Sequence, residues 1–332
     1  MLLRRFCWFP WPAMLGLRGA GRRPPGEYDV TTRARGPLAG FGWLKHGIGV
    51  GFRHPKPIYG GAGFMLLAAL LPMLVTLPLQ FQFQFRSPNP GTPPSPIIFV
   101  CIMALSMLIG LLIVPLNAGY LQVIDAAERG LPARARDVFK PYRDGEALRL
   151  IGYGLVLMLI YFAVLAIIIV ATGGGIARWY MQVLAAQANH LLPPPLPSGF
   201  GIAMALMTVF GLFMLGFYSI GFGQVALRRR GVFHALGDGA MGALKNLLPL
   251  LVLAVSLVLA WIVVWIALVI VVGLLVLLGL LVGPWLSLVL AIPVYAALVL
   301  VMFAIMFGVM YYLWRDVSGG DATSDVAPAI AA

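Results

Sequence analysis

The stretch that decides the fold is residues 246–314, NLLPLLVLAVSLVLAWIVVWIALVIVVGLLVLLGLLVGPWLSLVLAIPVYAALVLVMFAIMFGVMYYLW, which contains no charged residue. A membrane-spanning helix needs about 20 apolar residues, at a rise of 1.5 Å per residue. The stretch therefore predicts two spans, with a turn near residues 279–284. Pro293 is a candidate kink in the second of them.

The rest of the chain has the same character. Hydrophobic residues make up 61% of the 332 residues and charged residues 10%, against roughly 45–50% and about 25% in soluble domains. Further apolar runs cover about residues 58–79, 97–121, 148–171 and 200–226. Because a backbone in lipid must satisfy its own hydrogen bonds, such runs span membranes as helices. The sequence predicts an all-α, polytopic transmembrane helical bundle of six spans.

Basic residues fall on one side of this topology. The net charge is +12, and every Lys and Arg except Arg86 and Arg178 lies before the first span, in the connections 122–149 and 225–246, or at Arg315. The positive-inside rule makes that side cytoplasmic. We therefore expect a multi-pass protein of the cell inner (plasma) membrane with both termini inside. Its expected partners are the bilayer and anionic inner-leaflet lipids, and no nucleic acid.

Composition also predicts three regions. Residues 1–39 are rich in Arg, Pro and Gly and are expected to be a disordered basic extension; residues 40–317 form the transmembrane domain; residues 318–332 are expected to be a disordered tail. A twin-arginine export signal at Arg4 and Arg5 is the less favoured alternative for the extension, because Pro10 and Pro12 interrupt the apolar patch that follows.

Two segments have the pattern of helices that lie on the membrane surface. In residues 41–54, Trp43, Leu44, Ile48 and Phe52 fall on one helical face, although four glycines argue against a rigid helix. Residues 176–192 repeat the pattern on the expected outer side. Residues 80–96, which begin with alternating Gln and Phe, are expected to be an outside loop anchored at the interface.

Aromatic residues close to the ends of the last span predict its depth in the bilayer. Trp285 is expected at the outer interface. Tyr311, Tyr312 and Trp314 are expected at the inner interface, because Trp and Tyr concentrate at the headgroup level. Trp261 and Trp265 lie four residues apart on one face of the fifth span, which packing between helices would explain.

A helix–loop–helix plan occurs twice. Residues 115–171 contain a span end with Gly119, a charged connection and the next span; residues 217–272 contain a span end with Gly221 and Gly223, a connection with Arg228–Arg230, and the next span. This shared plan suggests a duplicated unit.

Three motifs carry a resemblance to a known family. They are an entry segment with Trp43, Leu44, Gly47, Phe52 and Pro55; the opening Asn246-Leu247-Leu248-Pro249; and the exit Tyr311-x-x-Trp314-Arg315-Asp316-Val317. Over about residues 40–317 the chain resembles a family of proteobacterial six-helix inner-membrane proteins with no assigned function. The resemblance implies the six-helix fold and transfers no catalytic residue. The N-terminal extension and the Trp at position 314 depart from the family pattern.

Two motifs could be mistaken for enzymatic sites. Residues 237–242 match G-x-G-x-x-G, but no strand precedes them and no carboxylate follows, so a glycine-rich helix entry explains them better than a dinucleotide site. Five carboxylates share the connection 122–149 with interspersed basic residues, and Asp125 lies four residues before Arg129. We expect a solvated helical connection whose charges neutralise one another rather than an acid–base site.

No metal, cofactor or catalytic residue is predicted. Cys7 and Cys101 form no pair motif, and the four histidines are scattered over different segments. No acidic or basic residue lies deep in a span, and the Ser and Thr side chains there are expected to bond to neighbouring helices.

Asn117, between Pro115 and Gly119, is the one candidate polar site within the membrane, by analogy with transporters that bind substrate at broken helices. The favoured hypothesis is a non-enzymatic membrane protein that organises the membrane or serves as a subunit or regulator of a complex, or as a homo-oligomer. The alternative is a transporter or channel for a small, weakly polar molecule. A polar-lined cavity near mid-membrane would distinguish the two.

Overall fold

The computed structural model describes residues 32–86, 96–171, 175–188 and 191–319, all within one compact unit, Thr31–Ala332. These residues form helices and contain no strand, which confirms the all-α prediction. The helices are, in order, α1 (Ala39–Arg53), α2 (Pro55–Arg86), α3 (Pro96–Glu128), the 3₁₀ helix η1 (Ala135–Phe139), α4 (Lys140–Arg143), α5 (Ala147–Ala171), α6 (Gly175–Ala188), α7 (Phe200–Arg228), α8 (Val232–Lys245), α9 (Leu247–Val282) and α10 (Pro284–Val317).

Six of these helices are long and apolar enough to cross a membrane, as predicted. The spans are Pro55–Leu79, Val100–Glu128, Ala147–Ala171, Phe200–Arg228, Leu247–Val282 and Trp285–Val317. Helix α2 continues beyond its span to Arg86, so the alternating Gln and Phe residues are helical and the prediction of a loop from residue 80 was wrong. Residues 87–95 of that predicted loop lie outside the described residues.

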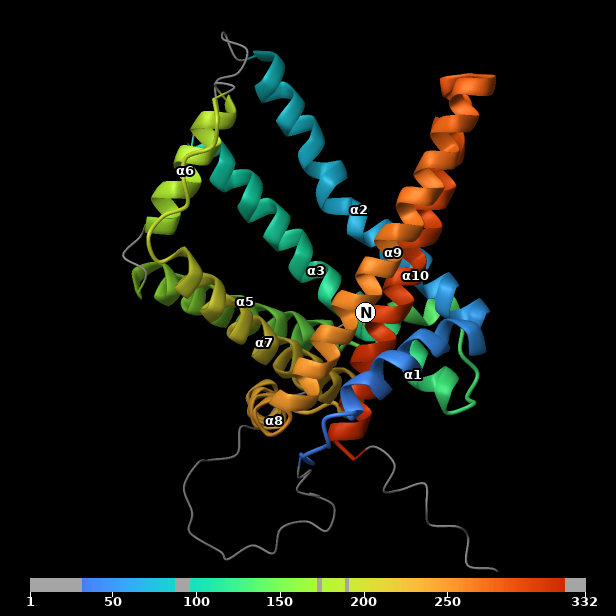
Figure 1. The fold of residues 1–332 in the computed structure, drawn as a ribbon. Coiled ribbons are helices and arrows are strands. Elements are labelled where there is room, and N and C mark those ends of the chain that lie inside the picture. Colours follow the sequence, from blue (N-terminus) through green and yellow to red (C-terminus); the bar gives the residue numbers. More distant parts are fainter. Residues whose placement is uncertain (1–31, 87–95, 172–174, 189–190, 320–332) are drawn as a thin grey trace, which may run out of the picture. The chain divides into compact units, whose positions relative to one another are not determined.

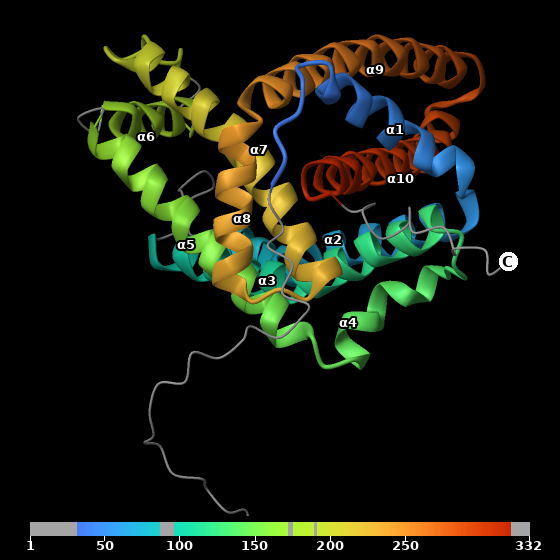
Figure 2. The same cartoon turned by 90° about the horizontal axis from the view of Figure 1, so that it is seen from below.

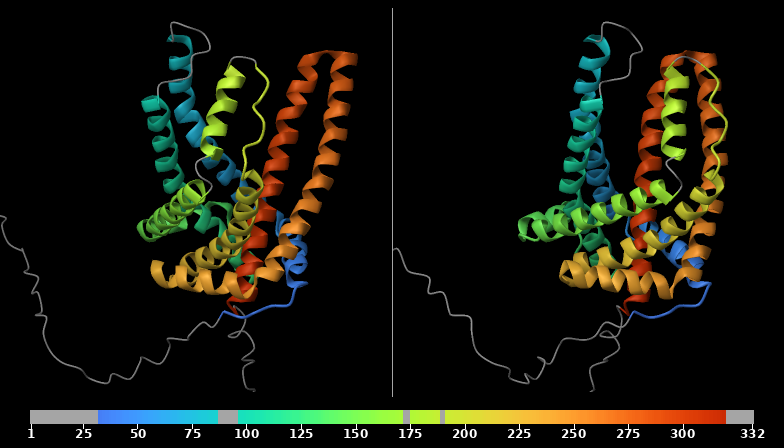
Figure 3. Two further views of the ribbon diagram at one scale, coloured as in Figure 1. Left: turned by 60° about the vertical axis from the view of Figure 1, so that its left-hand side comes forward. Right: turned by 90° about the vertical axis from the view of Figure 1, so that its left-hand side faces the viewer.

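The uncharged stretch 246–314 folds into a hairpin of two helices, α9 and α10, that lie side by side (Figures 1 and 3). Only Gly283 separates them. Its φ of 143° lies in a region of backbone conformation that residues other than glycine rarely adopt. The turn therefore lies at the place predicted, and glycine is required there. Helix α10 passes through Pro293 without ending.

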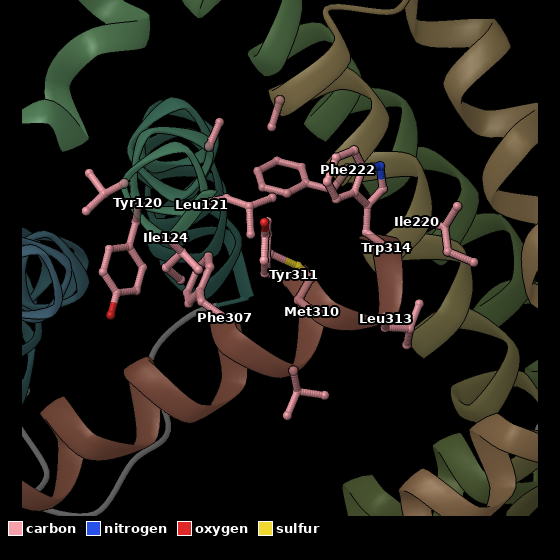
Figure 4. Close-up of a cluster of buried hydrophobic side chains, with 14 of the residues drawn as sticks. Tyr120, Leu121, Ile124, Ile220, Phe222, Phe307, Met310, Tyr311, Leu313 and Trp314 are labelled. Atoms are coloured by element: carbon pink, nitrogen blue, oxygen red, sulfur yellow. The ribbon is translucent and has the colours of Figure 1, made fainter. Parts of the chain in front are cut away.

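The hydrophobic core lies at one end of the spans. We call this the polar end; it is the end at which α1, η1, α4 and α8 join the six spans. Buried side chains come from the last turns of α3, α7 and α10 and the first turns of α2, α5 and α9. Figure 4 shows part of this core, in which aromatic and aliphatic side chains of α3, α7 and α10 meet: Tyr120, Leu121, Ile124, Phe222, Phe307, Met310, Tyr311 and Trp314.

The opposite end of the spans, which we call the far end, buries little. In the most hydrophobic window of each span, between 6% and 22% of residues are buried inside the protein, and α9 and α10 have the lowest share. Leu, Val and Ile side chains, with Trp261 and Trp265, dominate the exposed surface of α9. Lipid is as apolar as these side chains, so no hydrophobic force draws the far ends together.

Glycines allow the connections to pack against the spans. A Cβ atom on Gly119 of α3 would lie 1.9 Å from the Val138 carbonyl oxygen of η1. A Cβ atom on Gly239 of α8 would lie 2.7 Å from the Phe217 carbonyl oxygen of α7. Each connection of the suggested repeat thus folds back on the span before it through a glycine contact. The two connections differ in form, since one is η1 with the one-turn α4 and the other is the single helix α8.

Helix α1 is regular despite its glycines, contrary to the expectation from the sequence. It lies along α9 and α10 (Figure 2). A Cβ atom on Gly40 would lie 2.1 Å from the Pro249 carbonyl oxygen, and one on Gly47 would lie 2.7 Å from the Val309 nitrogen. The glycines therefore form the contact face of the helix, and the close approach that they permit offsets their low helix propensity.

The predicted single apolar face of α1 was also wrong. Trp43 and Leu44 are buried against the core, whereas Ile48 and Phe52 are exposed, Phe52 at 78%. The same packing buries Tyr311 and Trp314, which we expected near the inner membrane interface. Both are 1% exposed, because α1 and α7 cover the end of α10.

Candidate functional site

The polar end contains the densest set of polar contacts in the described residues, and it begins with the segment 32–38, which we call the strap. The Arg33 nitrogen donates to the Val317 carbonyl oxygen at 2.9 Å. Asn246, which is buried, accepts from the Arg35 nitrogen at 2.8 Å and donates to the Arg33 carbonyl oxygen at 3.0 Å. The strap therefore joins the start of α9 to the end of α10, and these residues of the predicted disordered extension are ordered.

Asp316 is the second anchor of the strap. Its carboxylate pairs with the Arg35 guanidinium at 2.7 Å and accepts from the Trp43 indole nitrogen at 2.9 Å. Trp43, Asn246 and Asp316 belong to the three motifs that carry the family resemblance. The fold brings the three motifs to one place, where their polar side chains connect α1, α9 and α10.

Glu128, at the end of α3, is the centre of a second group. Its carboxylate is 8% exposed and pairs with Arg53 of α1 at 3.0 Å. It also accepts a short hydrogen bond from the Tyr312 hydroxyl, and Arg53 donates to that hydroxyl at 2.7 Å. His54 approaches the same carboxylate at 3.8 Å. This closed set of partners connects α1, α3 and α10 and leaves the carboxylate little capacity for a substrate.

Asp125, one turn earlier in α3, makes the ion pair with Arg129 that the sequence predicted, at 2.9 Å. The same carboxylate oxygen accepts from the Tyr311 hydroxyl at 3.1 Å. Arg229, which ends α7 with a positive φ of 54°, pairs with Glu146 at 2.5 Å and lies 4.0 Å from Asp144.

The carboxylates of the connection 122–149 thus differ from the solvated set that we expected. Asp125 and Glu128 bond to α10, Glu128 pairs with α1, and Glu146 pairs with α7. The expected partners were neighbours along the chain, and the sequence carried no signal for partners far away in it. The connection is helical at both ends, where residues 122–128 belong to α3 and residues 147–149 to α5, and η1 and the one-turn α4 lie between them.

Asn117, the predicted intramembrane site, lies half-buried in an unbroken helix. Helix α3 runs through Pro115 and Gly119 without interruption, so the unwound segment on which the transporter analogy rests is not present. Gly119 permits close packing, and a proline in a membrane helix is tolerated because neighbouring groups satisfy the freed carbonyl. Neither of two cavities in the described residues is lined by Asn117.

Three hydroxyl side chains within the spans bond locally. Thr76, Ser219 and Ser256 each donate to the carbonyl oxygen four residues earlier in their own helix. These three hydroxyls therefore do not form the hydrogen bonds between helices that we expected. Gln122 does cross, donating to the Ala226 carbonyl oxygen of α7 at 2.9 Å.

The G-x-G-x-x-G match of residues 237–242 is entirely helical, within α8. Gly239 and Gly242 face α7, and Asp238 pairs with Arg230 at 2.6 Å. A phosphate-binding loop needs free backbone nitrogens at the start of a helix, and here they lie inside one. Within residues 32–86, 96–171, 175–188 and 191–319, no three His, Cys, Asp or Glu side chains are grouped so as to hold a metal ion.

Comparisons with protein-family models, with curated proteins and with solved structures find no match for this chain. The family resemblance therefore stays a prediction. What the geometry itself provides is a set of closed ion pairs and hydrogen bonds that fix helix ends to one another, together with apolar surfaces on the far ends of the spans.

Proposed function

We propose that this protein acts without catalysis in the bacterial inner membrane, as a subunit or regulator of a larger membrane complex, or as a homo-oligomer. The observation that supports the proposal is the low burial of the spans, at most 22% in any of them. A bundle that is fixed at its polar end and open along its far end offers several helix faces to other membrane helices.

The clearest open face is on α9. Seven apolar residues of this helix, including Trp261 and Trp265, line a shallow groove of about 640 Å³. The sequence attributes the two tryptophans to packing between helices, and no other described helix of this chain covers them, since both are exposed. Helices in membranes associate through packing and aromatic contact rather than through exclusion of water. A transmembrane helix of another subunit is the proposed occupant.

A transporter is less well supported. The unbroken α3 removes the broken-helix argument for Asn117.

The proposal is tested by incorporating a photo-crosslinking amino acid at single exposed positions in native membranes. Position 265 on α9 is compared with position 155 on α5, both of which are exposed. A protein adduct of discrete mass at position 265 but not at 155 supports a specific helix partner. If it persists when the purified protein is reconstituted alone, the partner is a second copy. Adducts with lipid only, at every exposed span position, would overturn the proposal.

A further inference from the structure

A second cavity lies where α3 meets the connection that follows it. It has a volume of about 400 Å³, within the roughly 300–1,000 Å³ typical of small-molecule sites. Val123 and Ala126 of α3 and Ala133 of the connection form its apolar side. Its charged side comes from η1, α4 and the residue after α4: Asp137, Lys140, Arg143 and Asp144.

The charged side carries both signs, and its internal pairing is incomplete. Arg143 and Asp137 lie 3.7 Å apart, and Asp144 lies 4.0 Å from Arg229. Both separations are at the long end for an ion pair. The other oxygen of Asp137 accepts from the Arg134 backbone nitrogen at 2.9 Å, but each carboxylate oxygen has two lone pairs, so both carboxylates can accept further hydrogen bonds. Within the described residues, Lys140 forms no ion pair with Asp137 or with Asp144.

The cavity is close to the level of the lipid headgroups. Gln122 and Val123 on its wall belong to the span Val100–Glu128. Tyr142, beside Arg143, donates a short hydrogen bond to the Leu112 carbonyl oxygen. Leu112 is ten residues before Gln122 in the helix, or about 15 Å at 1.5 Å per residue. The connection therefore folds back along α3 toward the membrane core, with the cavity between it and the end of the span.

We propose that this cavity binds a phosphate ester that carries a primary ammonium group. The phosphate would accept hydrogen bonds from Lys140 and Arg143, and the ammonium would donate to Asp137 and Asp144. The carbon chain between or beyond them would contact Val123 and Ala126. A simple anion would face two carboxylates, and a simple cation would face Lys140 and Arg143, so a zwitterion matches this wall better than either.

Two sources could supply this chemistry: the headgroup of phosphatidylethanolamine in the bilayer, or soluble phosphoethanolamine. The position of the cavity at the end of a span favours the lipid. The site does not depend on whether α9 has a helix partner, so the crosslinking result above and the binding result below can fail separately.

The experiment is native mass spectrometry of the full-length protein after mixing with phosphatidylethanolamine or phosphatidylglycerol in detergent, with titration calorimetry of soluble phosphoethanolamine. Lys140→Ala removes the phosphate partner, Asp144→Asn removes the ammonium partner, and Lys140→Arg restores a cation. Arg136→Ala is the matched control, because Arg136 is an exposed cation of the same connection that does not line the cavity.

We expect phosphatidylethanolamine to bind more tightly than phosphatidylglycerol. Lys140→Ala and Asp144→Asn should each weaken binding about tenfold or more, the loss expected for one hydrogen bond to a charged group. Lys140→Arg should recover most of it, and Arg136→Ala should stay within about twofold.

Equal binding of the two lipids, or equal loss in all the Ala variants, would mean general attraction between charges and would overturn the proposal. So would the absence of binding of both the lipid and soluble phosphoethanolamine. If the soluble compound binds as tightly as the lipid, the site is confirmed and its source is the soluble pool; if only the lipid binds, the source is the membrane. Unchanged thermal unfolding of each variant shows that the loss is not misfolding.

Discussion

The polar end and the far end of this protein are built from the same six helices and differ in almost every other respect. At the polar end, Trp314 is 1% exposed and lies in contact with the backbone of Gly223. Along the open face of α9, Trp265 is 60% exposed. The difference shows that the spans are held together at the polar end. There the hydrophobic core, the short helices, the strap and the ion pairs connect them.

The largest expected effect tests this contrast with one residue type. Trp314→Ala should lower the free energy of unfolding by about 3–5 kcal/mol, because it removes a large buried side chain and leaves a cavity. Trp265→Ala should change it by less than about 0.5 kcal/mol in detergent, where lipid-like contacts are equivalent. Denaturant unfolding of the two variants measures both values. Equal losses of unfolding free energy in the two variants would show that Trp265 is packed against other side chains in detergent.

A smaller effect distinguishes two glycines of α3. Gly119→Ala places a methyl group against the Val138 carbonyl and should destabilise the fold by about 1–3 kcal/mol. Gly110→Ala, toward the far end of the same helix, meets no atom within 4 Å and should be neutral or stabilising by up to about 1 kcal/mol. Thermal unfolding in the same detergent compares them, and a loss in Gly110→Ala would contradict an open far end.

The ion pair between Arg53 and Glu128 tests whether α1 is fixed to α3 by charge. In a double-mutant cycle with Arg53→Ala and Glu128→Ala, we expect a coupling free energy of roughly 0.5–3 kcal/mol. Glu128→Ala alone should cost more than Arg53→Ala alone, because it also removes the acceptor of the Tyr312 hydroxyl. A coupling close to zero would mean that packing of α1 alone determines its position.

The smallest effect depends on pH and concerns the phenol of Tyr142. Partial burial of this side chain raises its pKa above 10.0. Above pH 10 the unfolded chain releases this proton while the folded protein still retains it, so the native state loses stability as pH rises. The difference in stability between the native protein and Tyr142→Phe should be constant below pH 10. Above it, the native protein should lose stability relative to the variant, by well under the roughly 1.4 kcal/mol per pH unit of a fully buried group, because Tyr142 is 40% exposed and solvent screens it.

Tyr180→Phe, a change in the exposed side chain of α6, is the control for this measurement. A difference that stays constant up to pH 12 would mean that the Tyr142 hydroxyl does not lie against α3.

The six spans were predictable because each depends on a continuous apolar run, a property local to the sequence. The polar end was not, because its contacts join residues far apart in the chain. Nothing near Glu128 indicates Arg53, and nothing near Asn246 indicates the strap. The glycines of α1 have low helix propensity, so the sequence predicts no regular helix there. The helix forms because these glycines pack closely against the backbones of α9 and α10. The burial of Tyr311 and Trp314 could not be predicted either, because the sequence does not show that α1 and α7 cover them.

The strap has a consequence for the order in which the protein is made. Its first ordered residues leave the ribosome early, but the groups to which they bond, Asp316 and Val317, are among the last of the described residues to be synthesised. The polar end therefore cannot close during translation. It closes only once the sixth helix has been made, so no nascent form that lacks Asp316 and Val317 can adopt the native arrangement.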